Sequence, residues 1–295
     1  MNDGPSPANL QVPGVYRRRI GDIVVTALSD GFLDAPYEVI ANAAPDEIDA
    51  ALSARFRPTP PRISVNAFLI QSAGRTALID TGSGSSMGPT LGWLPANLVS
   101  AGVSPAGIDS VLLTHMHPDH SNGLCDAEGR PVFSSAELVM HEDEVAHWSD
   151  DSAMARADER QRVRYFQAAR AQLEPYRSQL RTIRSGEVFP GVTAMPIPGH
   201  TPGHTAYLVA SGRDELLIWG DIVHVPEVQT ARPQITMVFD TDPDAAAATR
   251  QKMFERVAAE RLLVTGMHLH FPGFAHVVAD RGRYELVPEH WSFVV

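Results

Sequence analysis

Three histidines and an aspartate are crowded into residues 114–120, which read THMHPDH and directly follow the apolar run VLL at 111–113. An apolar run followed by a polar burst is typical of a buried strand that ends in a loop. Imidazole and carboxylate donors without a thiolate suit Zn, Mn, Fe or Co. Neighbouring side chains on a turn point in different directions, so these four donors cannot comfortably share one tetrahedral ion. Two adjacent metal ions would divide them, and the rest of the chain must supply the missing ligands.

Three further predicted strands end in residues that can bind a metal. The apolar runs of these strands are followed by turns that contain Gly or Pro, and these turns carry His200, Asp221, and His268 or His270. One strand that ends in histidine would be ordinary, but several such ends are hard to explain by packing alone. The sequence therefore predicts a metal site built where four strands end.

Charge and cysteine content limit the partners and the compartment. Lys and Arg number 24 against 35 Asp and Glu, which gives a net charge of −11. This charge disfavours nucleic acid and anionic membranes as partners and mildly favours a neutral or cationic small substrate, although solubility alone is the simpler explanation. Cys125 is the only cysteine, so no internal disulfide can form. Without a signal-peptide core or a membrane-spanning apolar run, we expect a cytoplasmic protein with no membrane anchor.

The order of the expected elements indicates an α/β fold. Strands followed by a helix occur once in each half of the chain, which would suit two sheets packed face to face with helices outside. A convincing helix is expected over 243–259, with Asp242 as its N-cap. A second helical segment is expected over 153–179, with a break at Pro175. Residues 1–13, which are polar and rich in proline, are expected to form a flexible arm before a single domain of residues 14–295.

Seven stretches of the chain resemble one known family. They are ALSDG at 27–31, DTG at 80–82, GPTLG at 88–92, THMHPDH at 114–120, GHTPGHT at 199–205, GD at 220–221 and HLHFPG at 268–273. The pattern His-x-His-x-Asp-His, followed by a later His, an Asp and a final His, is similar to the mark of the metallo-β-lactamase superfamily. The resemblance extends over nearly the whole chain to the methyl parathion hydrolase branch, and it implies a four-layer αββα sandwich.

The resemblance also implies a role for each candidate ligand of two divalent ions, with zinc expected. One ion would be held by three histidines, His115, His117 and His200. The other would be held by three residues, Asp119, His120 and His268, and the Asp221 carboxylate would bridge both ions. His268 is preferred to His270 because the family's ligand lies three positions before the Phe of Phe-Pro-Gly. Asp80 resembles a carboxylate that orients one of the ligands from behind.

The remaining histidines and the cysteine are expected to have other roles. His204 should pack or hydrogen-bond under the His200 loop, and His270 would have a supporting or structural role. Five others are expected on the surface or in the core, namely His141, His147, His224, His276 and His290. Cys125 is expected to be a small buried residue, since no partner that would activate its thiol is apparent.

Three positions are expected to line the substrate pocket. Trp148 matches an aromatic position that lines the leaving-group pocket of the organophosphate-hydrolysing relative, and Phe166, beside Tyr165, falls near a second such position. The third is Met87, which offers apolar contact but not the same stacking face. Efficient turnover of aryl phosphotriesters is therefore not expected. Core packing is an equally simple explanation of Trp148 and Phe166.

The resulting expectation is a metal-dependent hydrolase. A hydroxide shared by the two ions would attack a neutral ester or lactone, and Asp119 would accept a proton or orient the nucleophile. Organophosphate triesters are expected as a side activity, and a dedicated phosphotriesterase is the nearest alternative. The alternative from another class is a non-catalytic metal or ligand sensor on the same fold. Relatives of this branch are often homodimers, which leaves a homodimer open for this chain.

Overall fold

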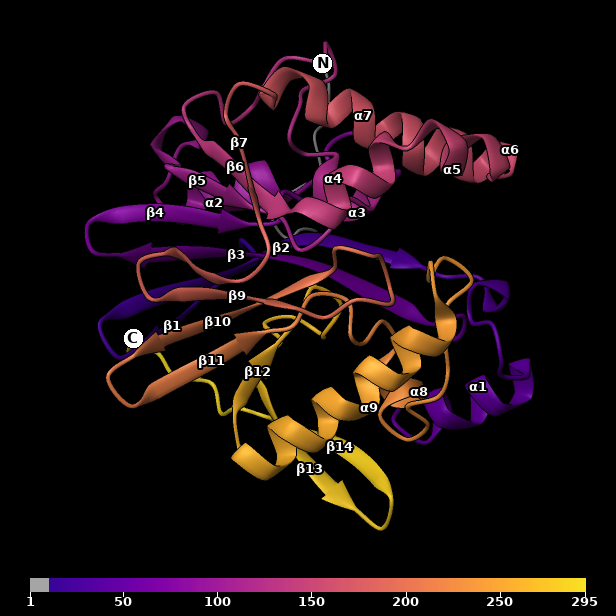
Figure 1. Ribbon diagram of the computed structural model, residues 1–295. Helices are drawn as coiled ribbons and strands as arrows, with labels where there is room; N and C mark the ends of the chain where they lie inside the picture. Colours follow the sequence, from indigo (N-terminus) through magenta and orange to yellow (C-terminus); the bar gives the residue numbers. More distant parts are fainter. Residues whose placement is uncertain (1–10) are drawn as a thin grey trace, which may run out of the picture.

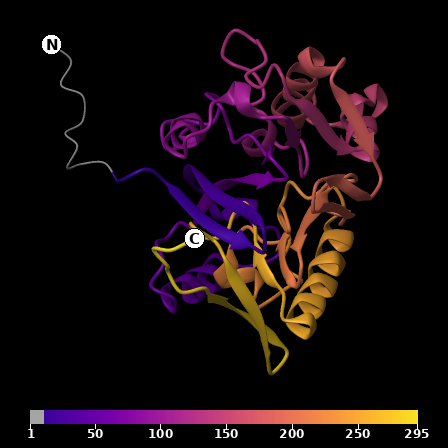
Figure 2. The same ribbon diagram turned by 90° about the vertical axis from the view of Figure 1, so that its left-hand side faces the viewer.

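Two β-sheets pack face to face in this protein, with helices on both outer faces (Figure 1). The computed structural model describes residues 11–295, so the first ten residues of the expected flexible arm lie outside the described part of the chain. Layers of helix, sheet, sheet and helix follow one another down Figure 1, and Figure 2 shows the same molecule after a quarter turn. The expected four-layer αββα sandwich is confirmed.

The first sheet contains seven strands that lie in sequence order. They are β1 (Val15–Ile20), β2 (Ile23–Asp34), β3 (Arg62–Ser72), β4 (Arg75–Ile79), β5 (Ser110–Leu112), β6 (Glu137–His141) and β7 (Leu180–Ile183). Strands β4 to β7 pair in parallel. Their carboxyl ends therefore lie at one end of the sheet, which is where open sheets of this kind place their functional loops.

The second sheet also contains seven strands, and β8 and β14 are at its two edges. Its members are β8 (Gly186–Phe189), β9 (Val192–Pro196), β10 (Thr205–Ser211), β11 (Asp214–Ile218), β12 (Leu263–Thr265), β13 (Ala275–Asp280) and β14 (Arg283–Pro288). Strand β10 is antiparallel to both β9 and β11, and β11 is parallel to β12. Strands β9, β11 and β12 therefore run in one direction, and the loops that follow them lie at a common end.

Most helices cover the first sheet. This layer contains α2 (Leu94–Ser100), α3 (Pro118–Ser121), α4 (Glu142–Ser149), α5 (Asp151–Arg156), α6 (Glu159–Gln161), the π-helical turn η4 (Arg162–Gln167) and α7 (Ala168–Leu173). The long helix α9 (Pro243–Glu260) covers the second sheet, and α1 (Pro45–Ser53) packs on α8 (Pro226–Gln229). The 3₁₀ turns are η2 (Tyr37–Val39), η3 (Pro105–Gly107) and η5 (Glu174–Tyr176). No helix within residues 11–295 is long and apolar enough to cross a membrane.

The apolar run at 111–113 shows how the two faces of the first sheet are buried. Leu112 packs into the core between the sheets, together with Phe68 and Ile218. Its neighbours Val111 and Leu113 point the other way, into the core under the helices. A strand that is covered on both faces needs apolar side chains at every position rather than at alternate ones. This explains why an unbroken apolar run comes directly before the histidine-rich stretch.

One of the two expected helices is confirmed and the other is broken. Helix α9 begins after Asp242, whose Oδ1 accepts a hydrogen bond of 3.0 Å from the backbone nitrogen of Ala245. The stretch 153–179 instead forms several short segments. Ala157 is extended, and Asp158 then caps a new helix by accepting a hydrogen bond of 2.7 Å from the backbone nitrogen of Gln161. The capping carboxylate thus restarts the helix at a point where the composition predicted no break before Pro175.

Candidate active site

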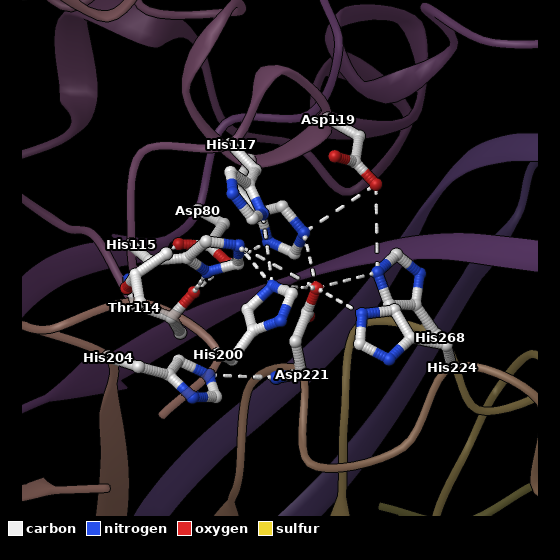
Figure 3. Close-up of polar contacts among 12 residues, drawn as sticks. Asp80, Thr114, His115, His117, Asp119, His200, His204, Asp221, His224 and His268 are labelled. Atoms are coloured by element: carbon white, nitrogen blue, oxygen red, sulfur yellow. Dashed lines mark hydrogen bonds and ion pairs between the residues drawn. The ribbon is translucent and has the colours of Figure 1, made fainter. Parts of the chain in front are cut away.

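All seven predicted ligand residues lie close together, beyond the carboxyl ends of strands from both sheets (Figure 3). The loop after β5 and helix α3 supply four of them, His115, His117, Asp119 and His120. The second sheet supplies the other three, His200 after β9, Asp221 after β11 and His268 after β12. Helix α3 begins with Pro118, which suits the first turn of a helix because its missing N–H has no partner to lose there.

Three imidazoles form the first triad, which consists of His115, His117 and His200. Nδ1 of His117 lies 3.0 Å from Nε2 of His200, and the latter lies 3.2 Å from Nε2 of His115. All three side chains are buried. Burial lowers the pKa of His115 and of His117 well below the ordinary value, so both rings are neutral near pH 7. Neutral imidazole is the form that binds a metal.

A carboxylate and two imidazoles form the second triad, which consists of Asp119, His120 and His268. One oxygen of Asp119, Oδ2, lies 3.6 Å from Nε2 of His120 and 3.6 Å from Nε2 of His268. Both histidines are buried, whereas the Asp119 side chain keeps 15% of its surface exposed. The second triad is therefore the part of the site that solvent can reach.

Asp221 lies between the two triads. Its Oδ2 is 3.3 Å from Nε2 of His200 in the first triad, and 3.2 and 3.0 Å from the Nε2 atoms of His120 and His268 in the second. Its other oxygen is buried and has no hydrogen-bond partner within the described residues. Burial alone would raise the pKa of Asp221, but His120 and His268 hold it well below its ordinary value. A buried carboxylate that stays ionised among imidazoles, with one oxygen unpaired, fits a site for cations shared by both triads.

Four of the ligand histidines are oriented from behind by a second residue. In each case the partner lies near Nδ1 of the ring. Nδ1 of His115 is 3.0 Å from Thr114 Oγ1, and Nδ1 of His120 is 2.7 Å from Asp80 Oδ2. Nδ1 of His200 is 2.6 Å from Asp240 Oδ1, and Nδ1 of His268 is 2.8 Å from the Ser64 carbonyl oxygen. Such contacts fix the tautomer and the direction of each ring. The structure thus places Asp80 where the sequence predicted a supporting carboxylate. It adds Asp240, which lies just before α9 and carries no local sequence signal.

His224 lies at the site, although the sequence indicated only a surface or core residue. It is buried, its Nε2 is 3.1 Å from Oδ2 of Asp221, and its ring stacks on that of His268 with centroids 5.0 Å apart. Burial lowers the pKa of His224 to about 4, so the ring is neutral. Its position three residues after Asp221 is the one signal that would have placed it here.

His204 has the supporting position expected of it. His204 Nε2 accepts a hydrogen bond of 3.0 Å from the backbone nitrogen of Asp221. Gly220 has a φ of +58°, and a Cβ at this position would overlap the His204 ring, so the backbone conformation and the close contact both require glycine.

His270 instead points away from the triads. Its Nε2 lies 2.8 Å from Oε1 of Glu227, and the residue lines a groove of about 1040 Å³ that contains none of the seven candidate ligands. His268, and not His270, therefore reaches the site.

Aromatic rings surround His117 of the first triad. The ring centroids of Tyr165, Trp148 and Phe239 lie 5.0, 5.7 and 6.0 Å from that of His117. Phe166 instead lies behind Trp148, with centroids 5.0 Å apart, in the core under the helices. Tyr165, carried by the π-helical turn, is thus the member of the 165–166 pair that faces the site. Phe239 had not been singled out, and Met87 is half-buried in the loop after β4.

Sequence comparison identifies the family. A model of the metallo-beta-lactamase superfamily matches residues 60–268. An N-acyl homoserine lactonase, AiiB of Agrobacterium fabrum (strain C58), is 33% identical over 102 residues, which span 28% of this chain and only 35% of that relative. The uncharacterized protein YobT of Bacillus subtilis (strain 168) is 28% identical over 207 residues, or 69% of this chain and 79% of YobT. The chain belongs to the metallo-β-lactamase superfamily.

Solved structures agree with this family. A hydrolase called AbOPH, of the beta-lactamase superfamily, superimposes with a TM-score of 0.90 at 30% identity and covers 96% of this chain and 100% of its own. AidC, a dizinc quorum-quenching lactonase, superimposes with a TM-score of 0.89 at 24% identity over 95% of this chain and 99% of its own. Within the superfamily, this chain is a metallo-hydrolase whose donor groups fit two metal ions. The methyl parathion hydrolase branch stays a prediction.

Proposed function

We propose that the protein uses a dinuclear metal site to hydrolyse neutral lactones or esters. The observation that carries this proposal is the position of Asp221 Oδ2, within 3.3 Å of an imidazole nitrogen of the first triad and of two in the second. One carboxylate shared by two sets of ligands is an arrangement that suits two adjacent ions. In this proposal the first triad holds one ion, the second triad holds the other, and zinc is the expected metal.

The chain's own residues would hold, orient and shield the reacting groups. Two divalent ions bound here would supply a water-derived nucleophile at neutral pH and polarise the substrate oxygen. Asp119 is the one candidate ligand whose side chain is partly exposed, so it can accept a proton from the attacking water or orient it. Tyr165, Trp148 and Phe239 form an apolar wall beside His117 that would exclude water and hold an acyl group.

Two observations support a neutral lactone or ester as the substrate. Within residues 11–295, no lysine or arginine makes an ion pair or hydrogen bond with any of the seven candidate ligands, which suits a substrate without a negative charge. The relatives include N-acyl homoserine lactonases, which act on neutral lactones by name. A phosphotriesterase is the second candidate, and the aromatic wall beside His117 favours it because aryl leaving groups pack on aromatic rings.

Metal analysis followed by a substrate panel tests the proposal. Purified protein reconstituted with zinc should hold about two ions per chain and lose activity to a chelator. Much less than one ion per chain, with no gain on reconstitution, would contradict it. Values of kcat/KM for an acyl lactone, an aryl ester and methyl parathion rank the lactonase, esterase and phosphotriesterase hypotheses. Intact function in Asp119→Asn or His117→Ala would instead favour the non-catalytic sensor.

Location and assembly complete the proposal. We expect the protein to act in the cytoplasm, because its single cysteine, Cys125, is buried and unpaired. The homodimer stays open, and the molecular mass in solution would decide it. A nucleic-acid partner is disfavoured by the net charge of −11.

A further inference from the structure

Glu144 is a buried carboxylate that the proposed reaction does not use. It lies in the first turn of α4, and its side chain is fully covered. Within residues 11–295 it forms no ion pair with lysine or arginine; its partners are all neutral hydrogen-bond donors. A buried charge is costly unless it is fully hydrogen-bonded, so a carboxylate kept in this position must have its oxygens well supplied with donors.

Each oxygen of Glu144 serves a different loop of the site. Oε1 accepts a hydrogen bond of 2.9 Å from the backbone nitrogen of Met116, the residue between His115 and His117. Oε2 accepts hydrogen bonds of 2.7 Å from Oγ1 of Thr201 and 3.1 Å from the backbone nitrogen of Gly203. Thr201 directly follows His200 in the sequence. One side chain thus connects the two segments that carry the first triad.

These two segments belong to different sheets. The Met116 loop follows β5 of the first sheet, and the Thr201 loop follows β9 of the second. The second loop also packs closely on α4, because a Cβ at Gly203 would overlap the backbone nitrogen of Glu144. Glycine is therefore what allows the Thr201 loop to reach the carboxylate, and the contact fixes the distance between the loops.

Trp148 is held by the same carboxylate. Its indole nitrogen, one helical turn after Glu144, donates a hydrogen bond of 2.6 Å to Oε1. The indole ring lies 5.7 Å from the ring of His117. Glu144 therefore determines the position of one aromatic wall of the site as well as the two loops.

We propose that Glu144 is a positioning residue that sets the geometry of the first triad by binding both of its loops at once. This inference rests on the proposed dinuclear function, because it concerns how tightly the first triad holds its ion. Hydrogen bonds from N–H and O–H groups to an ionised carboxylate are about twice as strong as neutral ones, so four of them form a stiff connection. None of the four hydrogen bonds of Glu144 involves a residue of the second triad, so we expect the second triad to be unaffected by its loss.

The variant Glu144→Gln tests this role. An amide keeps the shape, but it has only one acceptor oxygen, and its NH₂ group must face the donors of one loop or the other. We expect stepwise zinc titration against a competing chelator to give one ion with wild-type affinity and one bound about 10- to 100-fold more weakly. In the His268→Ala background, where only the first triad is intact, the remaining affinity should fall by the same factor. The NMR signal of the Trp148 indole N–H should also shift.

Glu142→Gln is the matched control. Glu142 lies two residues earlier in the same helix, is partly exposed, and forms a surface ion pair with Arg184. It should keep both affinities and the Trp148 signal of the wild type. If Glu144→Gln fails to fold, Thr201→Val removes a single donor while keeping the side-chain shape, and it should weaken the same ion by about 2- to 10-fold.

The possible results separate this inference from the function it rests on. The inference alone would be overturned if the wild-type protein binds two ions and a folded Glu144→Gln variant binds both with unchanged affinities. An equal weakening of both ions, or a lower melting temperature of the metal-free protein with no change in affinity, would also overturn it, because each of these indicates a general role in stability. Wild-type protein that binds no zinc would overturn the proposed function itself, and the metal-positioning role with it.

Discussion

The first and second triads use similar side chains but are held in different ways. The first consists of three buried imidazoles, and it depends on contacts between loops of both sheets that meet at Glu144. The second contains a carboxylate, Asp119, and takes two of its three residues from the single turn α3. The second triad has a carboxylate of its own to attract a cation, whereas the first consists of imidazoles alone and has only the shared Asp221 beside it. Substitutions should therefore affect the two triads by different routes.

Loss of the residue that both triads share should have the largest effect. Asp221→Asn keeps the shape of the side chain but removes the charge, so both ions should bind more weakly and kcat/KM for a lactone should fall on the order of 10³-fold or more. Elemental analysis and lactonase kinetics measure the two effects. Asp280→Asn, at an exposed position of β13, should change neither. Two tightly bound ions and full activity in Asp221→Asn would end the shared-carboxylate model.

Removal of one ligand from either triad should have the next largest effect. His117→Ala and His268→Ala should each leave about one ion per chain. Loss of a residue that only supports a ligand usually costs up to about 100-fold, so loss of a ligand should lower kcat/KM by more than about 100-fold. The two single variants should keep different ions, so combining them should remove both. If the double variant still holds an ion as tightly as either single variant, the division into two triads is wrong.

Substitution of a supporting carboxylate should weaken the ion of one triad only, and by less than the loss of a ligand. Asp240→Asn affects the residue behind His200 and should weaken the ion of the first triad, whereas Asp80→Asn affects His120 and the second. Each should weaken its own ion by about 10- to 100-fold. Stepwise zinc titration of Asp240→Asn in the His268→Ala background, and of Asp80→Asn in the His117→Ala background, measures each separately. If Asp240→Asn and Asp80→Asn weaken the binding of the same ion, the two triads are not held independently.

The smallest effect should come from the substrate pocket. Met87→Phe restores an aromatic ring at the position where the sequence lacks one, and a new aromatic contact should raise kcat/KM for an aryl phosphotriester about 2- to 10-fold relative to a lactone. The ratio of the two kcat/KM values is the measurement, since it cancels changes in metal content. Val99→Phe, at an exposed position of α2, is the control. An unchanged ratio would place Met87 outside the pocket.

The fold and the position of the candidate ligands could be predicted because their signals are local. His115, His200, Asp221 and His268 each follow an apolar run within a few residues, and strands that run in one direction bring such positions to a common end. The run VLL at 111–113 likewise indicated a buried strand. These inferences need only the sequence next to each residue.

The residues that were missed act through contacts between distant parts of the chain. Asp240 lies 40 positions from His200, and Glu144 lies 57 positions from Thr201. Nothing near either acid distinguishes it from a helix cap or an exposed carboxylate. Tyr165 faces the site from a π-helical turn, whose rotation departs from the 3.6-residue period on which helical-face predictions depend. Neighbouring sequence therefore located the ligands, and the family resemblance added Asp80, but neither indicated Asp240 or Glu144.

Both triads draw their members from both sheets, so a bound ion would hold the two halves of the sandwich together. The unfolded chain has no such arrangement and would bind the metal weakly, so the free energy of metal binding adds to the free energy of unfolding. An ion present at 100 times its Kd contributes about 2.7 kcal/mol in this way. The melting temperature should therefore rise with the concentration of free metal, and in a cell depleted of metal the protein would be exposed to proteases as well as inactive.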